Sequence, residues 1–162
     1  MSEADSQKIA FDTSFVKHFL KQITFSAVVD RLSTNLLDKD LVTSDYPRAV
    51  KDREVKFPTG LPTAPIGIAI PHTDPQYVKT NAVSVGILKE PIEMTVMGTE
   101  EGDKVQVSII FLLSLAQSNK HLNILKRIMG FVQNQELLKK FQTASDEEVA
   151  EEVQKAILEG LS

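Results

Sequence analysis

Apolar residues recur along the chain in two spacings, and these spacings predict where helices and strands lie. Residues 24–37 carry apolar side chains three and four positions apart, as the buried face of a helix does. Residues 66–70 alternate large with small side chains, and residues 82–88 place apolar side chains on one side, as strands do. Residues 105–116 are apolar on both faces in their middle, which indicates a central strand covered on both sides. A short apolar run at residues 15–20 predicts a first strand.

Start and stop signals predict further helices. Residues 44–55 form one of them, with Pro47 in the first turn, where a missing N–H costs nothing. The others follow the last strand, at residues 118–133, 134–141 and 145–160. Ser145 and Glu148 form a capping box at the start of the last helix.

Two segments between these elements are predicted to be connections. Residues 57–65 are dense in proline and glycine, which is typical of a loop. Residues 90–103 join the last two strands as a connection with a little extended structure. The order is then one strand, two helices, three strands and three helices, which predicts an α/β domain of three layers, α/β/α, with helices on both faces of a small sheet. We expect residues 1–12 to be disordered or loosely ordered and residues 13–162 to form the domain.

The composition is that of a globular protein and narrows the possible functions. The 162 residues fit the size of one domain, and 42% hydrophobic and 25% charged residues allow a real core. A net charge of −4 without a basic cluster gives nucleic-acid binding little support. The chain starts with polar and acidic residues, unlike a secretory signal, so we expect a cytoplasmic protein. It has no cysteine, which excludes disulfides, thiolate chemistry and cysteine-bound metals.

His72 lies in the stretch GIAIPHTD, where a predicted strand is followed directly by Pro-His. Ligands of open α/β sheets bind at the carboxyl ends of the strands. Pro71 fixes the backbone before the histidine and removes a competing N–H. His72 is therefore either an imidazole held at the sheet edge for chemistry or an ordinary surface histidine, and the local pattern leaves both open. Asp74 either orients His72 or belongs to an Asp-Pro turn.

The chain has two other histidines. With Ser118 as the N-cap, His121 is the third residue of a helix, where free N–H groups attract anions. It shares a helical face with Ile128 and Val132, so we expect it to face the sheet, and position alone favours a histidine at the core edge. His18 lies among apolar residues with no partner in view, and we assign it a structural role.

Arg53 lies on the same helical stripe as three apolar residues, Tyr46, Val50 and Phe57. An arginine that leans inward needs an anionic partner or a route to water. It is either part of an anion site or a cation that complements the end of its helix. Thr59 and Gly60 offer a hydroxyl and a backbone N–H to an anion, or simply form the turn.

Two histidines, an arginine and a Thr-Gly turn together indicate an anion site that needs no metal and no cofactor. The chain lacks a P-loop, a G-x-S-x-G elbow and a His-x-x-x-His zinc spacing. A zinc site built from His72, Asp74 and His121 would make a metal hydrolase. That alternative stays open, as does a plain binding module with a structural His72.

Residues 53–74, REVKFPTGLPTAPIGIAIPHTD, resemble the central signature of the enzyme IIA components of the sugar phosphotransferase system, fructose/mannitol class. That signature is an Arg-Glu, a Thr-Gly turn and an apolar strand that ends in Ile-Pro-His. Residues 120–128, KHLNILKRI, are similar to the second His-Leu of the family, which opens a helix. The FPTG form of the loop resembles the galactitol-type branch. The resemblance runs from about Thr24 onward and implies the mannitol-type enzyme IIA fold, a small mixed sheet with helices on both sides in the order β-α2-β3-α3.

The resemblance also implies a phosphocarrier. His72 matches the phosphorylated histidine, which takes a phosphoryl group from phospho-HPr and gives it to a cysteine of enzyme IIB. His121 matches the second histidine, which stabilises the phosphoryl group, and Arg53 and Thr59 match phosphate-binding residues. No metal or cofactor is implied, and the membrane is involved only through enzyme IIC. Because this chain has no cysteine, enzyme IIB must lie on a separate chain.

Two further expectations concern the partner and the biological role. Ile68 and Ile70, with the loop before them, are predicted to form an apolar rim on which the partner docks. The alternative role is that of a regulatory protein of the same fold, whose phosphorylation state controls a partner without sugar transport. The sequence favours transport because the loop and the Thr-Asp after Pro-His are closer to the galactitol-type branch.

Overall fold

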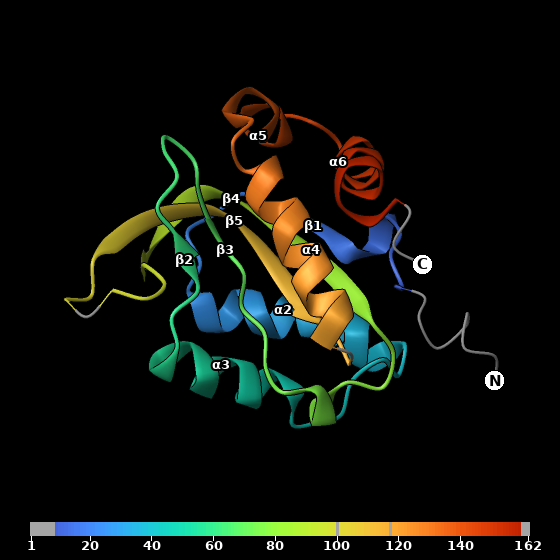
Figure 1. The fold of residues 1–162 in the computed structure, drawn as a ribbon. Coiled ribbons are helices and arrows are strands. Elements are labelled where there is room, and N and C mark those ends of the chain that lie inside the picture. The colour runs from blue at the N-terminus through green and yellow to red at the C-terminus, as the bar shows by residue number, and fades with distance from the viewer. Residues whose placement is uncertain (1–8, 100, 117, 160–162) are drawn as a thin grey trace.

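The computed structural model describes residues 9–99, 101–116 and 118–159, and among them one five-stranded sheet lies between two layers of helices (Figure 1). The strands are β1 (Val16–Phe19), β2 (Gly60–Leu61), β3 (Gly67–Ala69), β4 (Ala82–Thr95) and β5 (Lys104–Ser114). Their order across the sheet is β1-β4-β5-β3-β2. The sheet is mixed, because β1 pairs with β4 and β3 pairs with β5 in parallel, whereas β4–β5 and β2–β3 are antiparallel.

The helices begin near the predicted start signals. They are α2 (Phe25–Asp38), α3 (Tyr46–Lys56), α4 (Ser118–Phe131), α5 (Gln135–Phe141) and α6 (Asp146–Val153), with η1 (Thr13–Phe15), η2 (Pro75–Tyr77) and the π-helical turn η3 (Gln154–Leu158). Thr24 caps α2, because its hydroxyl accepts the N–H of Ala27 at 3.1 Å. The predicted capping box of Ser145 and Glu148 is confirmed at the start of α6.

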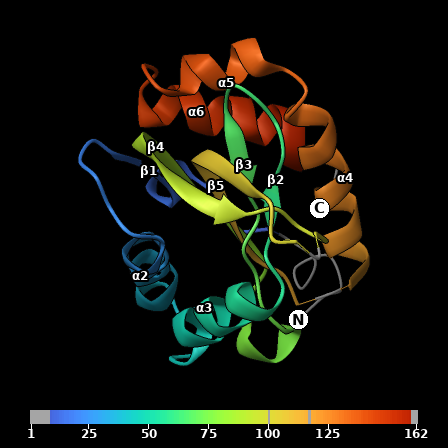
Figure 2. The ribbon, with the colours of Figure 1, turned by 90° about the vertical axis from the view of Figure 1, so that its left-hand side faces the viewer.

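Each face of the sheet has its own hydrophobic core. Figure 2 shows α2 and α3 on one side of the strands and α5 and α6 on the other. Side chains of α2 and α3 pack on one face, and side chains of α4, α5 and α6 pack on the other. The central strand β5 supplies both cores, with Phe111 and Leu113 on the side of α4 and Ile110 and Leu112 on the side of α2. The predicted three-layer architecture and the doubly covered central strand are confirmed.

Two segments predicted as connections contain strand. Four strands, not three, lie between α3 and α4, because β2 forms inside the proline-rich segment 57–65. In addition, β4 continues through residues 90–95 and pairs with the start of β5 after a register shift. Cross-strand pairing is a non-local contact, so neither segment needed the regular alternation by which strands were predicted.

The two ends of the chain are only partly covered by the described residues. Residues 1–8 of the segment predicted to be loose lie outside them, as does Gly160, the predicted end of the last helix. The backbone N–H of Ala10 nevertheless donates to the carbonyl of Asn81 at 2.7 Å, which attaches this part of the segment to the sheet. In the described part of the chain, no helix is both long and apolar enough to span a membrane.

His18 ties the edge strand β1 to the C-terminal helices, a role for which the sequence offered no partner. Its Nε2 lies 2.8 Å from the carbonyl oxygen of Phe141, and its Nδ1 lies 2.5 Å from Oδ1 of Asp146. These contacts join β1 to the end of α5 and the start of α6. They are in keeping with the structural role assigned to His18.

Candidate functional site

His72 follows the C-terminal end of β3, where two backbone contacts hold the chain. The carbonyl of Pro71 accepts the N–H of Leu113 at 3.0 Å, so pairing with β5 continues past the last residue of β3. The carbonyl of Thr59 accepts the N–H of Ile70 at 3.3 Å on the opposite side. His72 is therefore attached to the rigid sheet rather than to a free loop, and its side chain is half-buried.

The imidazole of His72 has a defined tautomer in its neutral form. Its Nδ1 lies 2.8 Å from the carbonyl oxygen of Ile70, which only accepts hydrogen bonds, so Nδ1 carries the proton. The lone pair then lies on Nε2. Burial lowers the pKa of His72, and the nearby charge of Arg53 lowers it further, against the opposing effects of the Ile70 hydrogen bond and the charge of Asp74. A neutral imidazole with a basic Nε2 is the form that acts as a nucleophile.

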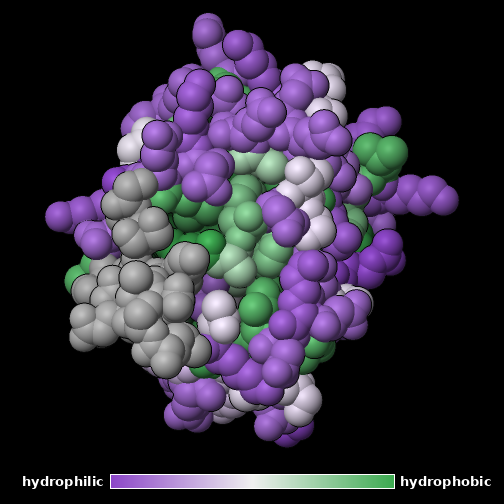
Figure 3. Space-filling view, turned by 90° about the vertical axis from the view of Figure 1, so that its right-hand side faces the viewer, coloured by the Kyte–Doolittle hydropathy of each residue, from purple (hydrophilic) through white to green (hydrophobic). Residues whose placement is uncertain are grey.

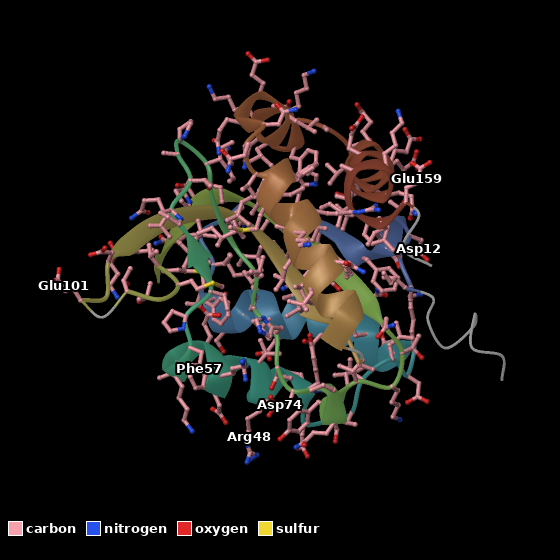
Figure 4. The ribbon with its side chains drawn as sticks, in the orientation of Figure 1. Asp12, Arg48, Phe57, Asp74, Glu101 and Glu159 are labelled. Atoms are coloured by element: carbon pink, nitrogen blue, oxygen red, sulfur yellow. The ribbon has the colours of Figure 1, made fainter. Side chains whose placement is uncertain are left out.

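Arg53, near the end of α3, supplies a cation close enough to affect His72. One terminal nitrogen, Nη1, lies 3.3 Å from Oδ1 of Asp74, and the guanidinium carbon lies 5.1 Å from the centre of the Phe57 ring. Figure 4 shows Phe57 and Asp74 on the side of the molecule that α3 forms. The Nε of Arg53 is buried and has no hydrogen-bond partner in the described part of the chain. This arrangement holds the guanidinium in place while leaving donors for an anion.

Thr59 is buried in the loop between α3 and β2, where it binds Glu54. Its backbone N–H donates to Oε2 of Glu54 at 2.8 Å, and its hydroxyl donates to Oε1 at 2.7 Å. A hydroxyl has one proton, so in this conformation Thr59 has none left to donate to an anion. Its role as a direct phosphate ligand stays a prediction.

His121 lies in the first turn of α4, and its side chain is outside what the structure describes. The helix starts at Ser118, so Ser118 is its first residue rather than the N-cap that the sequence predicted. Asn81 anchors the segment before it, since its Oδ1 accepts the N–H of Ala116 at 2.8 Å. The convergence of His121 on His72 therefore stays a prediction.

The predicted docking rim is wrong for Ile68 and Ile70. Ile68 is 0% exposed and Ile70 is 2% exposed, so both belong to the core and present no surface to a partner. Alternation along the strand turns these two side chains toward the helices of one layer. The loop before them, the other part of the predicted rim, does expose an apolar side chain, because Phe57 at its start is 59% exposed.

Two further residues contribute to this site, and sequence reasoning overlooked one of them, Glu54. Phe57 lies four residues after Arg53, and the helical stripe predicted for these two residues agrees with the contact between their side chains. For Glu54, no local pattern shows that a glutamate binds a loop residue five positions later. Its partner is set by the path of the loop.

Apolar surface also gathers elsewhere, in a hollow ringed by hydrophilic residues on the face seen in Figure 3. A cavity of about 580 Å³ lies between the described start of the chain and the segment formed by α6 and η3. It is lined by Phe11, Asp12, Thr13, Glu147, Ala150, Glu151, Glu152, Gln154, Lys155 and Glu159. None of these lining residues belongs to the site around His72. Within the described residues no group of three histidine, aspartate or glutamate side chains is placed to hold a metal ion.

The fold and the site define an α/β protein that holds a half-buried imidazole at the end of a strand, with an arginine of α3 close enough to affect it. Residues 11–158 match the family described as the phosphoenolpyruvate-dependent sugar phosphotransferase system, EIIA 2. The match covers nearly the whole chain, and the chain belongs to this family. It is therefore a phosphotransferase-system component of the type that carries phosphoryl groups.

Individual relatives agree with this assignment. The chain is 24% identical over 145 residues to the galactitol-specific EIIA component of Escherichia coli strain K12, covering 90% of this chain and 95% of that protein. It is 31% identical over 93 residues to the transcriptional regulator ManR of Bacillus subtilis, covering 57% of this chain and 13% of the regulator. A solved complex of enzyme IIA for mannitol with phosphorylated enzyme IIB from Escherichia coli has the same fold, with a TM-score of 0.69 at 19% identity over 93% of this chain and 98% of that one.

Proposed function

We propose that this protein is a phosphocarrier that accepts a phosphoryl group on Nε2 of His72 from phospho-HPr. It then passes the group to a cysteine of enzyme IIB on a separate chain, for uptake and phosphorylation of a galactitol-like sugar or sugar alcohol. The observation that carries the proposal is the hydrogen bond from Nδ1 of His72 to the carbonyl of Ile70, which leaves Nε2 as the basic atom. The proposed location is the cytoplasm, with the membrane involved only through enzyme IIC.

The proposed reaction is two displacements at phosphorus. In the first, the lone pair of His72 Nε2 forms a P–N bond while the P–N bond of phospho-HPr breaks and its histidine keeps the electron pair. In the second, the thiolate of enzyme IIB forms a P–S bond while the bond to Nε2 breaks. The proton stays on Nδ1, hydrogen-bonded to the Ile70 carbonyl, in both steps. Phosphoryl transfer depends mainly on positioning and on charge stabilisation, which a fixed imidazole beside a cation provides.

The remaining site residues have supporting roles in this proposal. Arg53 stabilises the negative charge that the equatorial oxygens carry in the transition state. His121 stabilises the phosphoryl group as a second, neutral donor, as the family resemblance implies. Thr59 is the third phosphate-binding residue that the resemblance implies, although in this conformation its hydroxyl proton is given to Glu54.

The proposed partner is supported by two observations. The related mannitol protein was solved in complex with phosphorylated enzyme IIB, and the chain studied here contains no cysteine that could be the next acceptor. The similarity to a short part of the regulator ManR favours the second candidate function, in which phosphorylation of His72 controls a partner without sugar transport. Coverage of nearly the whole galactitol component favours transport.

The test is intact mass spectrometry after incubation with phosphoenolpyruvate, enzyme I and HPr. We expect the wild-type chain to gain one acid-labile phosphoryl group and the His72→Ala variant to gain none. His18→Ala is the matched control, because it removes a histidine that lies outside the site. Phosphorylation of the His72→Ala variant, or an unmodified wild type with a competent HPr, would refute the proposal. Metal analysis of the purified protein addresses the zinc alternative, which requires bound metal.

Adding a purified enzyme IIB of the galactitol type separates the two roles. Loss of the phosphoryl group from His72 together with its appearance on a cysteine of enzyme IIB supports transport. A phosphorylated chain that never loses its group to such a partner favours the regulatory role.

A further inference from the structure

Glu54 is a partly buried carboxylate for which the reaction described above has no use. Burial raises its pKa, against the lowering effect of the two hydrogen bonds from Thr59. No salt bridge to Glu54 is found among the described residues. Removing a carboxylate from water without a cation beside it costs free energy, so the placement of Glu54 in this partly buried position needs an explanation.

Each of the two carboxylate oxygens of Glu54 accepts one hydrogen bond from Thr59. Oε2 accepts the backbone N–H and Oε1 accepts the hydroxyl, at 2.8 and 2.7 Å. The far side of the same loop is held against β4, because the N–H of Met97 donates to the carbonyl of Gly60 at 2.8 Å. A Cβ on Gly60 would lie 2.6 Å from the carbonyl oxygen of Thr95, so only glycine permits this approach. The loop is thus fixed from both sides.

From Thr59 the contacts continue to the imidazole. The Thr59 carbonyl accepts the N–H of Ile70 at 3.3 Å, and the Ile70 carbonyl accepts the Nδ1–H of His72 at 2.8 Å. Glu54 is also the residue next to Arg53 on α3. One turn of α3 therefore carries the cation itself and is connected to the imidazole through two hydrogen-bonded residues, Thr59 and Ile70.

We propose that Glu54 is a positioning residue for phosphoryl transfer, which fixes the tautomer of His72 and its placement relative to Arg53 through Thr59 and Ile70. Glu54 acts through these residues and not by contact with the phosphoryl group. The inference rests on the proposed phosphocarrier function and assigns to Thr59 the role of a link in this chain.

The first test compares Glu54→Gln with Asp52→Asn in the full chain. Glutamine replaces one acceptor oxygen with an N–H donor, so it cannot accept both donors of Thr59. Asp52 lies on the same helix, is exposed, and loses the same charge. We expect Glu54→Gln to accept the phosphoryl group from phospho-HPr roughly 10- to 100-fold more slowly, since small displacements of reacting groups cost about that much. The KM for phospho-HPr should not change, and Asp52→Asn should behave as wild type.

The decisive readout is the nitrogen-15 NMR spectrum of the His72 ring in the unphosphorylated protein. The wild type should show the Nδ1–H tautomer alone, and Glu54→Gln should show a mixture. A purely structural role for Glu54 would lower stability without changing the tautomer. This readout needs no phosphoryl transfer, so failure of the phosphocarrier function and failure of this inference are distinguished.

A second pair of variants covers the case in which Glu54→Gln does not fold. Thr59→Val removes the hydroxyl donor at nearly constant volume, and Thr59→Ser restores it. We expect Thr59→Val to reproduce the slower transfer and the mixed tautomer, and Thr59→Ser to return both to wild-type values. If Glu54→Gln or Thr59→Val keeps both the single tautomer and the wild-type rate, the inference is overturned.

Discussion

The Nδ1 atom of His72 lies 2.8 Å from the carbonyl oxygen of Ile70, two residues earlier in the chain. This contact occupies Nδ1 and leaves the lone pair of the neutral ring on Nε2. The carbonyl itself is held in place because Ile70 also donates its N–H to Thr59. The chemistry proposed for the imidazole thus depends on backbone geometry at the end of a strand.

Replacing Arg53 should slow phosphoryl transfer while the fold is kept. Arg53→Gln removes the cation, and loss of one such stabilising donor typically costs about 10²- to 10³-fold in rate. Arg53→Lys should lie between Arg53→Gln and wild type, because lysine keeps the charge but not the planar fork. Rates of phosphorylation by phospho-HPr give the measurement. The control is Asp52→Asn, which removes an exposed charge from the same helix and should not slow the transfer. Equal rates for Arg53→Gln and wild type would contradict the assigned role.

The pKa of His72 should lie below 6.5, its ordinary value, because burial and Arg53 both disfavour the imidazolium. The neutral nucleophile should then persist as the pH falls through 6.5, and the rate of phosphoryl acceptance should decline only at lower pH. Arg53→Gln should raise this pKa, and Asp74→Asn should lower it further. Titration of the ring followed by NMR measures all three values. A pKa above 6.5 in the wild type would contradict the burial described here.

The same lowered pKa predicts how stability depends on pH. The unfolded chain takes up a proton on His72 near pH 6.5, whereas the folded protein takes it up only at lower pH. The contribution of His72 to the free energy of unfolding is therefore complete above about pH 6.5 and is lost as the pH falls toward the folded pKa. Urea denaturation of the wild type and of His72→Gln, at about pH 7.5 and about pH 5.5, measures the difference. The wild type should lose more stability than the variant, and parallel losses would exclude this contribution.

Gly67 and Gly130 should respond in opposite ways to alanine. A Cβ on Gly67 would lie 2.3 Å from the carbonyl oxygen of Gln106, so β3 would have to move away from β5 at a cost of about 1–3 kcal/mol. A Cβ on Gly130, an exposed position of α4, would meet nothing within 4 Å and should stabilise the helix by about 0.5–1 kcal/mol. The denaturation midpoints of the two variants, compared with that of the wild type, measure both changes in stability. If Gly67→Ala left the stability unchanged, β3 would not approach β5 as closely as described.

His18 should contribute to stability but not to phosphoryl transfer. Removing its ring with His18→Ala leaves the carbonyl of Phe141 and the carboxylate of Asp146 without their partner, at an expected cost of about 1–3 kcal/mol. A double-mutant cycle with Asp146→Ala isolates the coupling between the two side chains. Phosphorylation per folded molecule should equal that of wild type. A coupling energy near zero would show that the ion pair does not contribute.

The helices and the long strands were predictable because their signals are local. The apolar periodicity of residues 24–37 and the capping box at Ser145 locate α2 and α6 within one residue of where they begin. The doubly apolar middle of β5 likewise predicted burial on both faces. Strand β2 was missed, and the extent of β4 was not predicted, because strand pairing depends on segments that are not adjacent in the sequence.

The sequence by itself determined the three-layer α/β order, which follows from the periodicity of apolar residues. It also determined that His72 directly follows a strand, because the apolar run that predicts the strand ends in Pro71-His72. It also determined the family, through motifs spread over most of the chain. Only the tertiary structure decided the mixed strand order, the burial of Ile68 and Ile70, and the hydrogen bonds of Glu54 and His18. The physical reason is that each of these depends on which distant segments meet, and a hydrogen bond between side chains or across strands leaves no regular spacing in the sequence.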